Sequence, residues 1–162
     1  MQIELFTTGG TFDKIYFDAL SEFAIGAPQA PTLLQQGNVS AAITVTELLR
    51  KDSLELDDKD RELIAQQVKR STAEGVVIVH GTDTMALTGQ RLAAISNKTI
   101  VLVGAMQPAA MRDSDAPFNL GFALAAVQLA PTGVYIAMNG QLLPAAHAIK
   151  DRQRMCFVDS RG

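Results

Sequence analysis

Four short runs of apolar residues constrain the fold of this chain more than any other feature. They span residues 3–7, 76–80, 99–103 and 134–138, and each is rich in β-branched residues and bounded by Gly, Thr or Asn. Hydrophobicity that is continuous rather than alternating is typical of strands in a parallel sheet covered on both faces. The runs therefore predict four buried, parallel strands.

Patterns of helical period lie between these runs. The segment 57–75 has Asp57 as an N-cap, acidic residues in its first turn and basic residues in its last. The segment 84–95 repeats apolar residues at spacings of three and four. The segment 117–131 is bracketed by prolines and is apolar on most faces, as in a buried helix. Strands alternating with helices predict an α/β fold, a three-layer sandwich around a mostly parallel sheet.

Two further stretches carry weaker signals. Residues 12–38 contain prolines and glycines without a sustained period. They predict a mobile loop followed by a short helix in the sequence PTLLQQG. Asn139-Gly140 is a strong hairpin signal, with residues 141–143 as the returning strand. At 162 residues, we expect one domain over residues 1–162.

Composition argues against several classes of function. The net charge is −3, from 14 basic and 17 acidic residues, so no basic stripe is available to hold a nucleic acid. No apolar run approaches a membrane span, and we expect no membrane partner. The start of the chain carries no visible secretory signal, and the single cysteine, Cys156, cannot form an internal disulfide. Both observations predict a cytoplasmic location.

Small and hydroxyl residues follow the predicted strands. The first strand ends in TTGGT (residues 7–11), the second in HGTDT (80–84) and the third in GAMQP (104–108). Open α/β sheets bind ligands at the carboxyl ends of their strands. Taken alone, TTGGT fits a flexible turn, a backbone cradle for an anion, or a nucleophile on a hinge. It matches neither GxGxxG nor GxxxxGK[ST], so no nucleotide-binding fingerprint is present.

The second motif offers an acid beside a hydroxyl. Thr82 and Asp83 fit a helix cap, but a carboxylate at a sheet crevice can also hold a substrate ammonium. A hydroxyl is a poor nucleophile until a base removes its proton. Tyr16 and Lys150 are the candidate assistants, although Lys150 taken alone also fits an ordinary solvated lysine. Two histidines and one cysteine are too few for a metal site, so we expect neither metal nor cofactor.

The motifs together resemble a known family. TTGGTFDK, VVIVHGTDTM, and VGAMQP followed by DSDAPFNL resemble the bacterial-type L-asparaginases, in order from Ile3 to about Phe157. The resemblance implies an asparaginase N-terminal-domain fold with a terminal hairpin. It also implies an enzyme of asparagine catabolism that hydrolyses a small molecule, L-asparagine, to L-aspartate and ammonia. The expected route is a threonine nucleophile and an acyl-enzyme intermediate.

The resemblance also assigns roles to individual residues. Thr11 corresponds to the nucleophile and Tyr16 to a tyrosine on a lid over about residues 12–25. Lys150 completes a Thr-Lys-Asp relay with Thr82 and Asp83. The backbone N–H groups around Gly10, Thr11 and Thr82 are candidates for an oxyanion hole. The expected substrate contacts are Gly10, Asp52, Ser53, Gly81, Thr82 and Asp83.

The chain also departs from the family pattern. It stops where a second, smaller domain usually begins, so it resembles the short, single-domain members. The missing domain would leave apolar surface to cover, which favours a homo-oligomer, a dimer or a tetramer. Leu54 stands where many relatives have a polar residue, and Gln107 replaces the more usual arginine.

Two other functions fit the same motifs. An amidase subunit that supplies ammonia to a partner enzyme would share the catalytic residues and need a docking surface. A catalytically weak module that binds an amino acid would keep the fold without turnover. The retained set of Thr11, Thr82, Asp83 and Lys150 favours an active amidohydrolase over a sensor.

Overall fold

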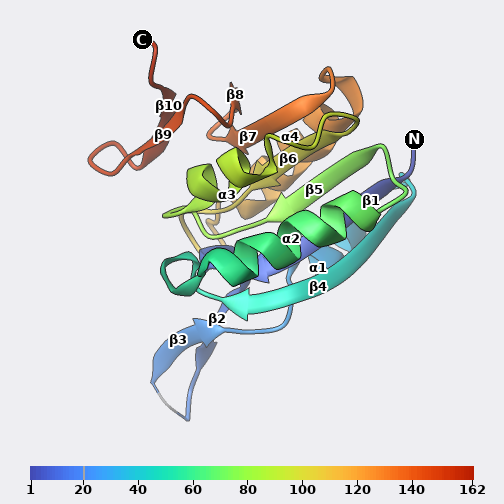
Figure 1. Ribbon diagram of the computed structural model, residues 1–162. Helices are drawn as coiled ribbons and strands as arrows, with labels where there is room; N and C mark the ends of the chain where they lie inside the picture. The colour runs from blue at the N-terminus through green and yellow to red at the C-terminus, as the bar shows by residue number, and fades with distance from the viewer. Residues whose placement is uncertain (20) are drawn as a thin grey trace.

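A computed structural model describes residues 1–19 and 21–162 of the chain (Figure 1). Its main sheet has six strands in the order β4-β1-β5-β6-β7-β8. Neighbouring strands are parallel except for β8, which runs antiparallel to β7. The strands are β1 (Ile3–Gly9), β4 (Ile43–Lys51), β5 (Gly75–Val79), β6 (Thr99–Val103), β7 (Gly133–Met138) and β8 (Gln141–Pro144). The predicted mostly parallel α/β fold is confirmed.

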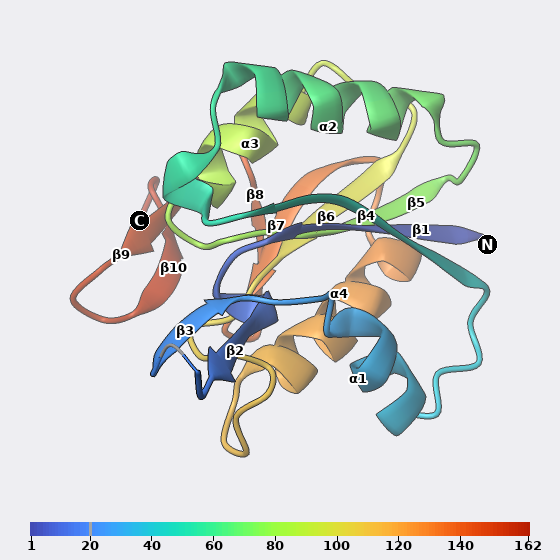
Figure 2. The same ribbon diagram turned by 90° about the horizontal axis from the view of Figure 1, so that it is seen from below.

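Helices cover both faces of the sheet. Helices α2 (Asp58–Arg70) and α3 (Met85–Leu92) lie over one face, and α1 (Ala30–Gln36) and α4 (Ala116–Leu129) over the other (Figure 2). Alternate strand residues divide between the two layers. Ile78 belongs to the core cluster with α2 and α3, whereas Val77 and Val79 belong to the cluster with α4. This strict alternation of fully buried residues explains why the strands are apolar on both sides.

The predicted helices and the turn are present, but α2 ends at Arg70 and α3 at Leu92, and Gly75, the predicted end of the first of these helices, instead begins β5. Asp57 and Asp60 form a reciprocal capping box at the start of α2, which typically stabilises a helix by about 1 kcal/mol. Lys51, at the end of β4, donates to the Asp60 carboxylate at 2.8 Å and ties this helix end to the sheet. At the tip of the β7–β8 hairpin, Asn139 and Gly140 have φ values of 54° and 74°, as the sequence predicted.

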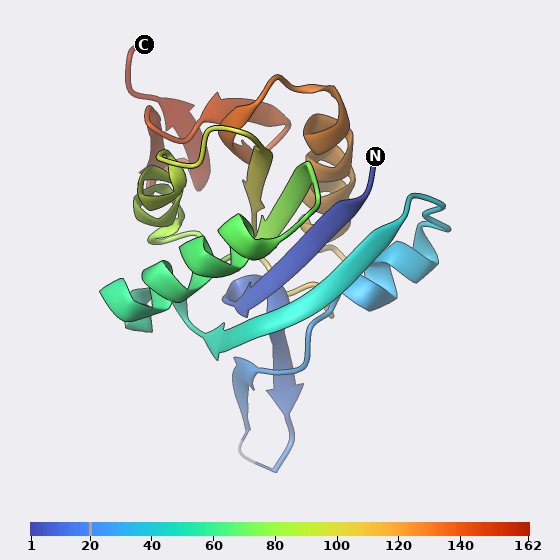
Figure 3. The ribbon, with the colours of Figure 1, turned by 45° about the vertical axis from the view of Figure 1, so that its right-hand side comes forward.

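Two parts of the fold differ from the prediction. The longest strand, β4, was not predicted, because it lies at an edge of the sheet and none of its residues is buried. The predicted mobile loop was wrong for most of its length. A 3-10 turn, η1 (Thr11–Asp13), leads into an antiparallel hairpin of β2 (Lys14–Phe17) and β3 (Glu22–Ile25), which projects from the body (Figure 3). Leu20, part of the predicted lid, lies outside the described residues.

A second hairpin closes the described chain. Strands β9 (Ala148–Asp151) and β10 (Cys156–Asp159) pair antiparallel beside the main sheet. Phe157 is fully buried in the cluster formed with α2 and α3, which anchors the hairpin to the body. A short turn, η2 (Ser53–Glu55), follows β4. Among the described residues, every helix is too short or too polar to cross a membrane.

Candidate active site

Glycines bring the ends of three strands into direct contact. A Cβ atom on Gly10 would lie 2.4 Å from the Cα atom of Gly81, and one on Gly81 would lie 2.6 Å from the Ser53 Cβ atom. Gly10 also has a φ of +74°, which side chains rarely allow. The turns after β1, β5 and β4 therefore stack on one another. The neighbours of these glycines, Thr11 and Thr82, are carried to the same edge of the sheet.

Lys150 reaches this edge from the β9–β10 hairpin. Its Nζ donates to the Thr82 hydroxyl at 2.7 Å and to Asp83 Oδ1 at 2.8 Å, across 68 and 67 residues of chain. The Lys150 side chain is only 14% exposed. Because the ammonium donates to the Thr82 oxygen, the hydroxyl proton is left free to point elsewhere. The predicted trio of Thr82, Asp83 and Lys150 is thus one hydrogen-bonded group.

A second cation that the sequence analysis missed joins this group. Arg152 Nη2 lies 3.2 Å from Asp83 Oδ1, the same oxygen that accepts from Lys150. The Arg152 side chain is 68% exposed and lies just past the end of the β9 strand, two residues after Lys150. Nothing in the sequence distinguishes it from a solvated arginine. Together, one carboxylate and two cations give this corner a net positive charge.

Thr11 begins η1 and is partly exposed. Its hydroxyl takes part in none of the hydrogen bonds among the described residues. The Gly10 N–H donates to the Lys51 carbonyl at 2.9 Å and is therefore already engaged. Within the described chain, the N–H groups of Thr11 and Thr82 have no backbone or side-chain acceptor. These two donors, rather than Gly10, remain available to a developing oxyanion.

Tyr16 makes no hydrogen bond to these residues in the described part of the chain. It lies on β2, is 51% exposed, and its ring packs edge-on against Phe23 with 5.4 Å between the ring centroids. No hydrogen bond joins Tyr16 to Thr11 in the part of the chain that the structure describes. The structure therefore does not bring the predicted lid tyrosine to the predicted nucleophile.

The turn after β4 contributes Asp52 and Ser53. Asp52 Oδ1 accepts from the Leu54 N–H at 3.1 Å, and its Oδ2 lies 3.3 Å from Lys14 Nζ on the β2 strand. Ser53 is almost fully buried, and its carbonyl accepts the Thr84 hydroxyl at 2.7 Å. Leu54 points its side chain outward and is 67% exposed. Ser53 is thus fixed against the HGTDT corner, while Asp52 is tied to the projecting hairpin.

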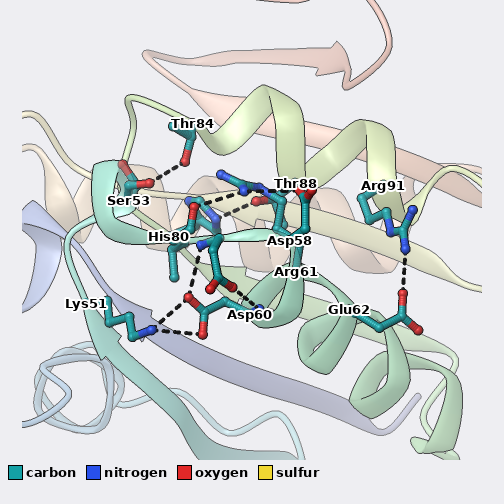
Figure 4. A network of polar contacts seen from close by, with 12 residues as sticks. Lys51, Ser53, Asp58, Asp60, Arg61, Glu62, His80, Thr84, Thr88 and Arg91 are labelled. Carbon is teal, nitrogen blue, oxygen red and sulfur yellow. Dashed lines mark hydrogen bonds and ion pairs between the residues drawn. The ribbon is translucent and has the colours of Figure 1, made fainter.

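Two buried titratable groups lie beside the site. The ring of His80 is fully buried; its Nδ1 lies 2.7 Å from the Gly81 carbonyl and its Nε2 lies 2.8 Å from the Thr88 hydroxyl (Figure 4). Burial lowers the pKa of His80 from 6.5 to about 4, so the ring is neutral at pH 7. Burial also raises the pKa of Asp13 from 3.8 to about 6, although its carboxylate accepts from the Gln29 N–H at 2.8 Å.

Other features of the surface lie elsewhere. The described residues contain no group of three or more His, Cys, Asp or Glu side chains that could hold a metal ion. An apolar hollow of about 380 Å³ lies between α1 and α4, lined by Leu33 and Leu124 among others. A second, of about 330 Å³, is lined by Phe122, Leu129 and Leu142. The candidate site is defined by contacts between strand ends and not by either hollow.

The structure thus defines an open α/β protein with a cluster of hydroxyl, lysine and carboxylate groups at the carboxyl edge of its sheet. The chain belongs to the asparaginase family. The family model described as "Asparaginase, N-terminal" matches residues 2–156. The resemblance inferred from the motifs is confirmed.

Individual proteins agree with this membership. The chain is 32% identical over 162 aligned positions to a glutaminase-asparaginase of Acinetobacter glutaminasificans, covering 91% of this chain and 49% of the relative. It is 33% identical over 113 positions to a glutamyl-tRNA(Gln) amidotransferase component of Methanococcus maripaludis, covering 68% of this chain and 27% of that relative. The thermostable L-asparaginase from Thermococcus kodakarensis superposes with a TM-score of 0.86 and 27% identity, covering 98% of this chain and 51% of that one. The chain spans about half the length of the L-asparaginases it matches, or less.

Proposed function

We propose that this chain hydrolyses the side-chain amide of L-asparagine to L-aspartate and ammonia. In the first step the Thr11 hydroxyl attacks the amide carbonyl, an ester forms, and the hydroxyl proton leaves with ammonia. In the second step water hydrolyses the ester and regenerates Thr11. Both steps are acyl transfers, which hydroxyl, amine and carboxylate side chains can catalyse.

The hydrogen-bonded group of Lys150, Thr82 and Asp83 carries this proposal. An amine held between a hydroxyl and a carboxylate is a proton relay rather than a solvated side chain, and Lys150 makes both contacts within 2.8 Å. Proton transfer by a group held in position contributes about 100- to 10,000-fold to a rate. We assign this relay to the water of the second step, because Lys150 bonds to Thr82 and not to Thr11.

Two free backbone donors support Thr11 as the nucleophile. Thr11 and Thr82 follow directly after Gly10 and Gly81, which are in contact. Their N–H groups can receive the negative charge that develops on the attacked carbonyl oxygen. Loss of one such donor typically costs about 100- to 1,000-fold in kcat. Tyr16 is then a group that reaches Thr11 when the β2–β3 hairpin closes over the substrate.

The remaining residues are proposed to hold the two ends of the amino acid. Asp83 keeps Oδ2 outside its contacts with Lys150 and Arg152 and can accept the substrate ammonium. Ser53 lies against the Gly81 backbone, and Ser53 and the preceding Asp52 complete the grip on the α-amino and α-carboxylate groups. Arg152 and Lys14 add positive charge that can attract the α-carboxylate of the substrate.

Association of several copies is part of the proposal. Helix α4 contains no charged residue, and it exposes Phe118 (64%) and Leu129 (84%) on its outer side. Leu129 also borders the apolar hollow of about 330 Å³ lined by Phe122 and Leu142, and contiguous apolar surface of this kind is typical of a face that a partner covers. We propose a homo-oligomer, a dimer or tetramer, which light scattering distinguishes from a monomer.

A second function is favoured by one comparison. The similarity to a component of a glutamyl-tRNA(Gln) amidotransferase, over 68% of this chain, supports an amidase that delivers ammonia to a partner enzyme. The same catalytic residues would act, so mutation does not separate the two functions. Turnover of free asparagine by the isolated chain favours the first function. Turnover that requires a co-purifying protein favours the second.

The test is an ammonia-release assay with asparagine and glutamine on Thr11→Val and Thr82→Val variants. We expect Thr11→Val to reduce turnover to background, because no ester can form. Thr82→Val should turn over slowly and accumulate an ester that mass spectrometry locates on residues 7–14. Thr72→Val, at an exposed threonine, is the matched control. Unchanged turnover in Thr11→Val, or an ester on residues 80–84, overturns the assignment.

A further inference from the structure

The proposed reaction makes no use of His80, a buried titratable residue that directly precedes Gly81 of the candidate site. It sits between the end of β5 and the Gly81–Thr82 corner and is 0% exposed. Both of its ring nitrogens have partners, the Gly81 carbonyl and the Thr88 hydroxyl (Figure 4). With both nitrogens engaged and the ring enclosed, His80 has no free atom to offer a metal ion or a proton path.

The partners fix the tautomer of this ring. A carbonyl oxygen only accepts hydrogen bonds, so the 2.7 Å contact to Gly81 requires a proton on Nδ1. The neutral ring then has no proton on Nε2, which accepts the Thr88 hydroxyl proton at 2.8 Å. The Gly81 carbonyl thus selects the Nδ1–H form, and the Thr88 hydroxyl on α3 holds the ring in place through its other nitrogen.

The Gly81 carbonyl belongs to the same peptide unit as the Thr82 N–H. No peptide bond among the described residues is cis, and in a trans unit the C=O and N–H groups point in opposite directions. A carbonyl held by the interior His80 ring therefore turns the Thr82 N–H away from the interior. That N–H has no acceptor in the described part of the chain.

Gly81 makes such a constraint necessary. A side chain at this position would overlap Ser53, so the close contact between the turns demands glycine. Glycine also has the greatest backbone freedom, which would let this peptide unit rotate. The His80 hydrogen bond removes that freedom on one side of Thr82. On the other side, the Thr84 hydroxyl donates to the Ser53 carbonyl at 2.7 Å.

We propose that His80 is a positioning residue that orients the Gly81–Thr82 peptide unit, so that the Thr82 N–H faces the reacting carbonyl. The kinetic part of this inference rests on the proposed amide hydrolysis, whereas the tautomer does not. His80 acts through the backbone and touches no substrate. Thr88 is its partner, a second positioning residue on the first turn of α3.

Two substitutions separate the roles of the ring nitrogens. In His80→Asn, the side-chain amide nitrogen reaches about as far as Nδ1 and can still donate to Gly81. In His80→Gln, the amide reaches about as far as Nε2, and the Gly81 carbonyl loses its donor. We expect kcat to stay within about fivefold of wild type in His80→Asn. In His80→Gln it should fall about 100-fold, as for a lost oxyanion donor, with KM changed less than about threefold.

Thr88→Val supplies a second arm if His80→Gln does not fold. Valine cannot bond to Nε2, so the ring loses one of its two anchors and holds the Gly81 carbonyl less firmly. We expect a fall in kcat of about tenfold without a large change in KM. Equal kcat values for His80→Asn and His80→Gln, or a wild-type kcat in Thr88→Val, overturn the inference.

The tautomer is tested without turnover by ¹⁵N NMR of the labelled imidazole ring. The wild type should show a protonated Nδ1 and an unprotonated Nε2 between about pH 5.5 and 8, with no titration. Thr88→Val should keep the Nδ1–H form, because the Gly81 carbonyl still requires it, and should change only the chemical shift of Nε2. A wild-type Nε2–H ring, or titration near pH 6.5, overturns the inference even if amide hydrolysis is confirmed. Conversely, the NMR result stands if the wild-type chain releases no ammonia from asparagine or glutamine.

Discussion

Two hairpins flank the carboxyl edge of the sheet, and they hold their functional residues in opposite ways. The β9–β10 hairpin is anchored by the fully buried Phe157, whose N–H donates to the Asn139 side chain at 3.3 Å. Lys150 pairs with Phe157 across this hairpin and reaches its partners. The β2–β3 hairpin projects from the body, and its Tyr16 is half exposed (Figure 3).

The anchored hairpin holds Lys150 in position for proton transfer, whereas the projecting hairpin must move before Tyr16 can take part. Asn139, in the β7–β8 turn, extends this anchoring of the β9–β10 hairpin into the body, because its own N–H donates to the side chain of the buried Asn119 at 3.3 Å. The base of the second hairpin is closed by the Gly26 N–H, which donates to the Asp13 carbonyl at 2.8 Å, and Lys14 links it to Asp52 of the body at 3.3 Å. Packing therefore preorganises Lys150, whereas Tyr16 takes part only after the hairpin closes.

The largest loss of activity is expected from a substitution in the anchored β9–β10 hairpin. Lys150→Met removes the amine and keeps the length of the side chain, so Asp83 retains only the exposed Arg152 as a cation. We expect kcat to fall about 100- to 10,000-fold, because the proton relay is lost. Steady-state ammonia release measures this. Lys69→Met, at an exposed lysine late in α2, is the control and should leave kcat unchanged. A fall of less than about tenfold in Lys150→Met would contradict a preorganised relay.

A smaller effect, on the free energy of unfolding, is expected from Asp13 at the base of the projecting β2–β3 hairpin. Burial raises the pKa of Asp13 from 3.8 to about 6, so the folded chain keeps a proton that the unfolded chain releases. This contribution to the free energy of unfolding is full below about pH 4 and is lost as the pH rises through 6. At pH 7 the buried carboxylate is charged and destabilises the fold by about 3 kcal/mol at most.

Asp13→Asn tests this directly. Asparagine keeps a carbonyl acceptor for the Gln29 N–H but carries no charge, so we expect a higher free energy of unfolding at pH 7. The gain should be about 1–3 kcal/mol at pH 7 and close to zero at pH 4. Urea unfolding at both pH values measures it, with Asp18→Asn on the exposed part of the same hairpin as control. An equal effect at the two pH values would exclude titration of Asp13 as the cause.

The sequence predicted those parts of this arrangement that depend on local patterns. The strands β1, β5, β6 and β7 are continuous apolar runs, and the motifs TTGGT and HGTDT sit at the ends of β1 and β5. Strand β4 was missed because it lies at a sheet edge, where polar residues such as Thr44 and Thr46 are tolerated. The β2–β3 hairpin was missed because a projecting hairpin needs no buried face and leaves no hydrophobic period.

The contacts within the site depend on tertiary folding. The sequence named Lys150, but only through resemblance, since no local pattern reveals a bond across 68 residues. Arg152 and Lys14 look like ordinary surface cations until the hairpins bring them to Asp83 and Asp52. His80 had one available signal, its place directly before Gly81, but its partner Thr88 depends on how α3 packs.

The smallest effect is expected on kcat in Tyr16→Phe, on the projecting β2–β3 hairpin. The hydroxyl of the exposed Tyr16 makes no hydrogen bond to a described residue, so its loss should leave the thermal midpoint unchanged. If the hairpin closes during turnover, kcat should fall about tenfold. This is less than the loss expected for a group that is held in position for proton transfer throughout the reaction. Tyr135→Phe, on β7, is the matched control for loss of a phenolic hydroxyl. A wild-type kcat in Tyr16→Phe would show that the hairpin carries no catalytic group. The two hairpins would then differ in function as well as in anchoring, because only the one packed through Phe157 would take part in the chemistry.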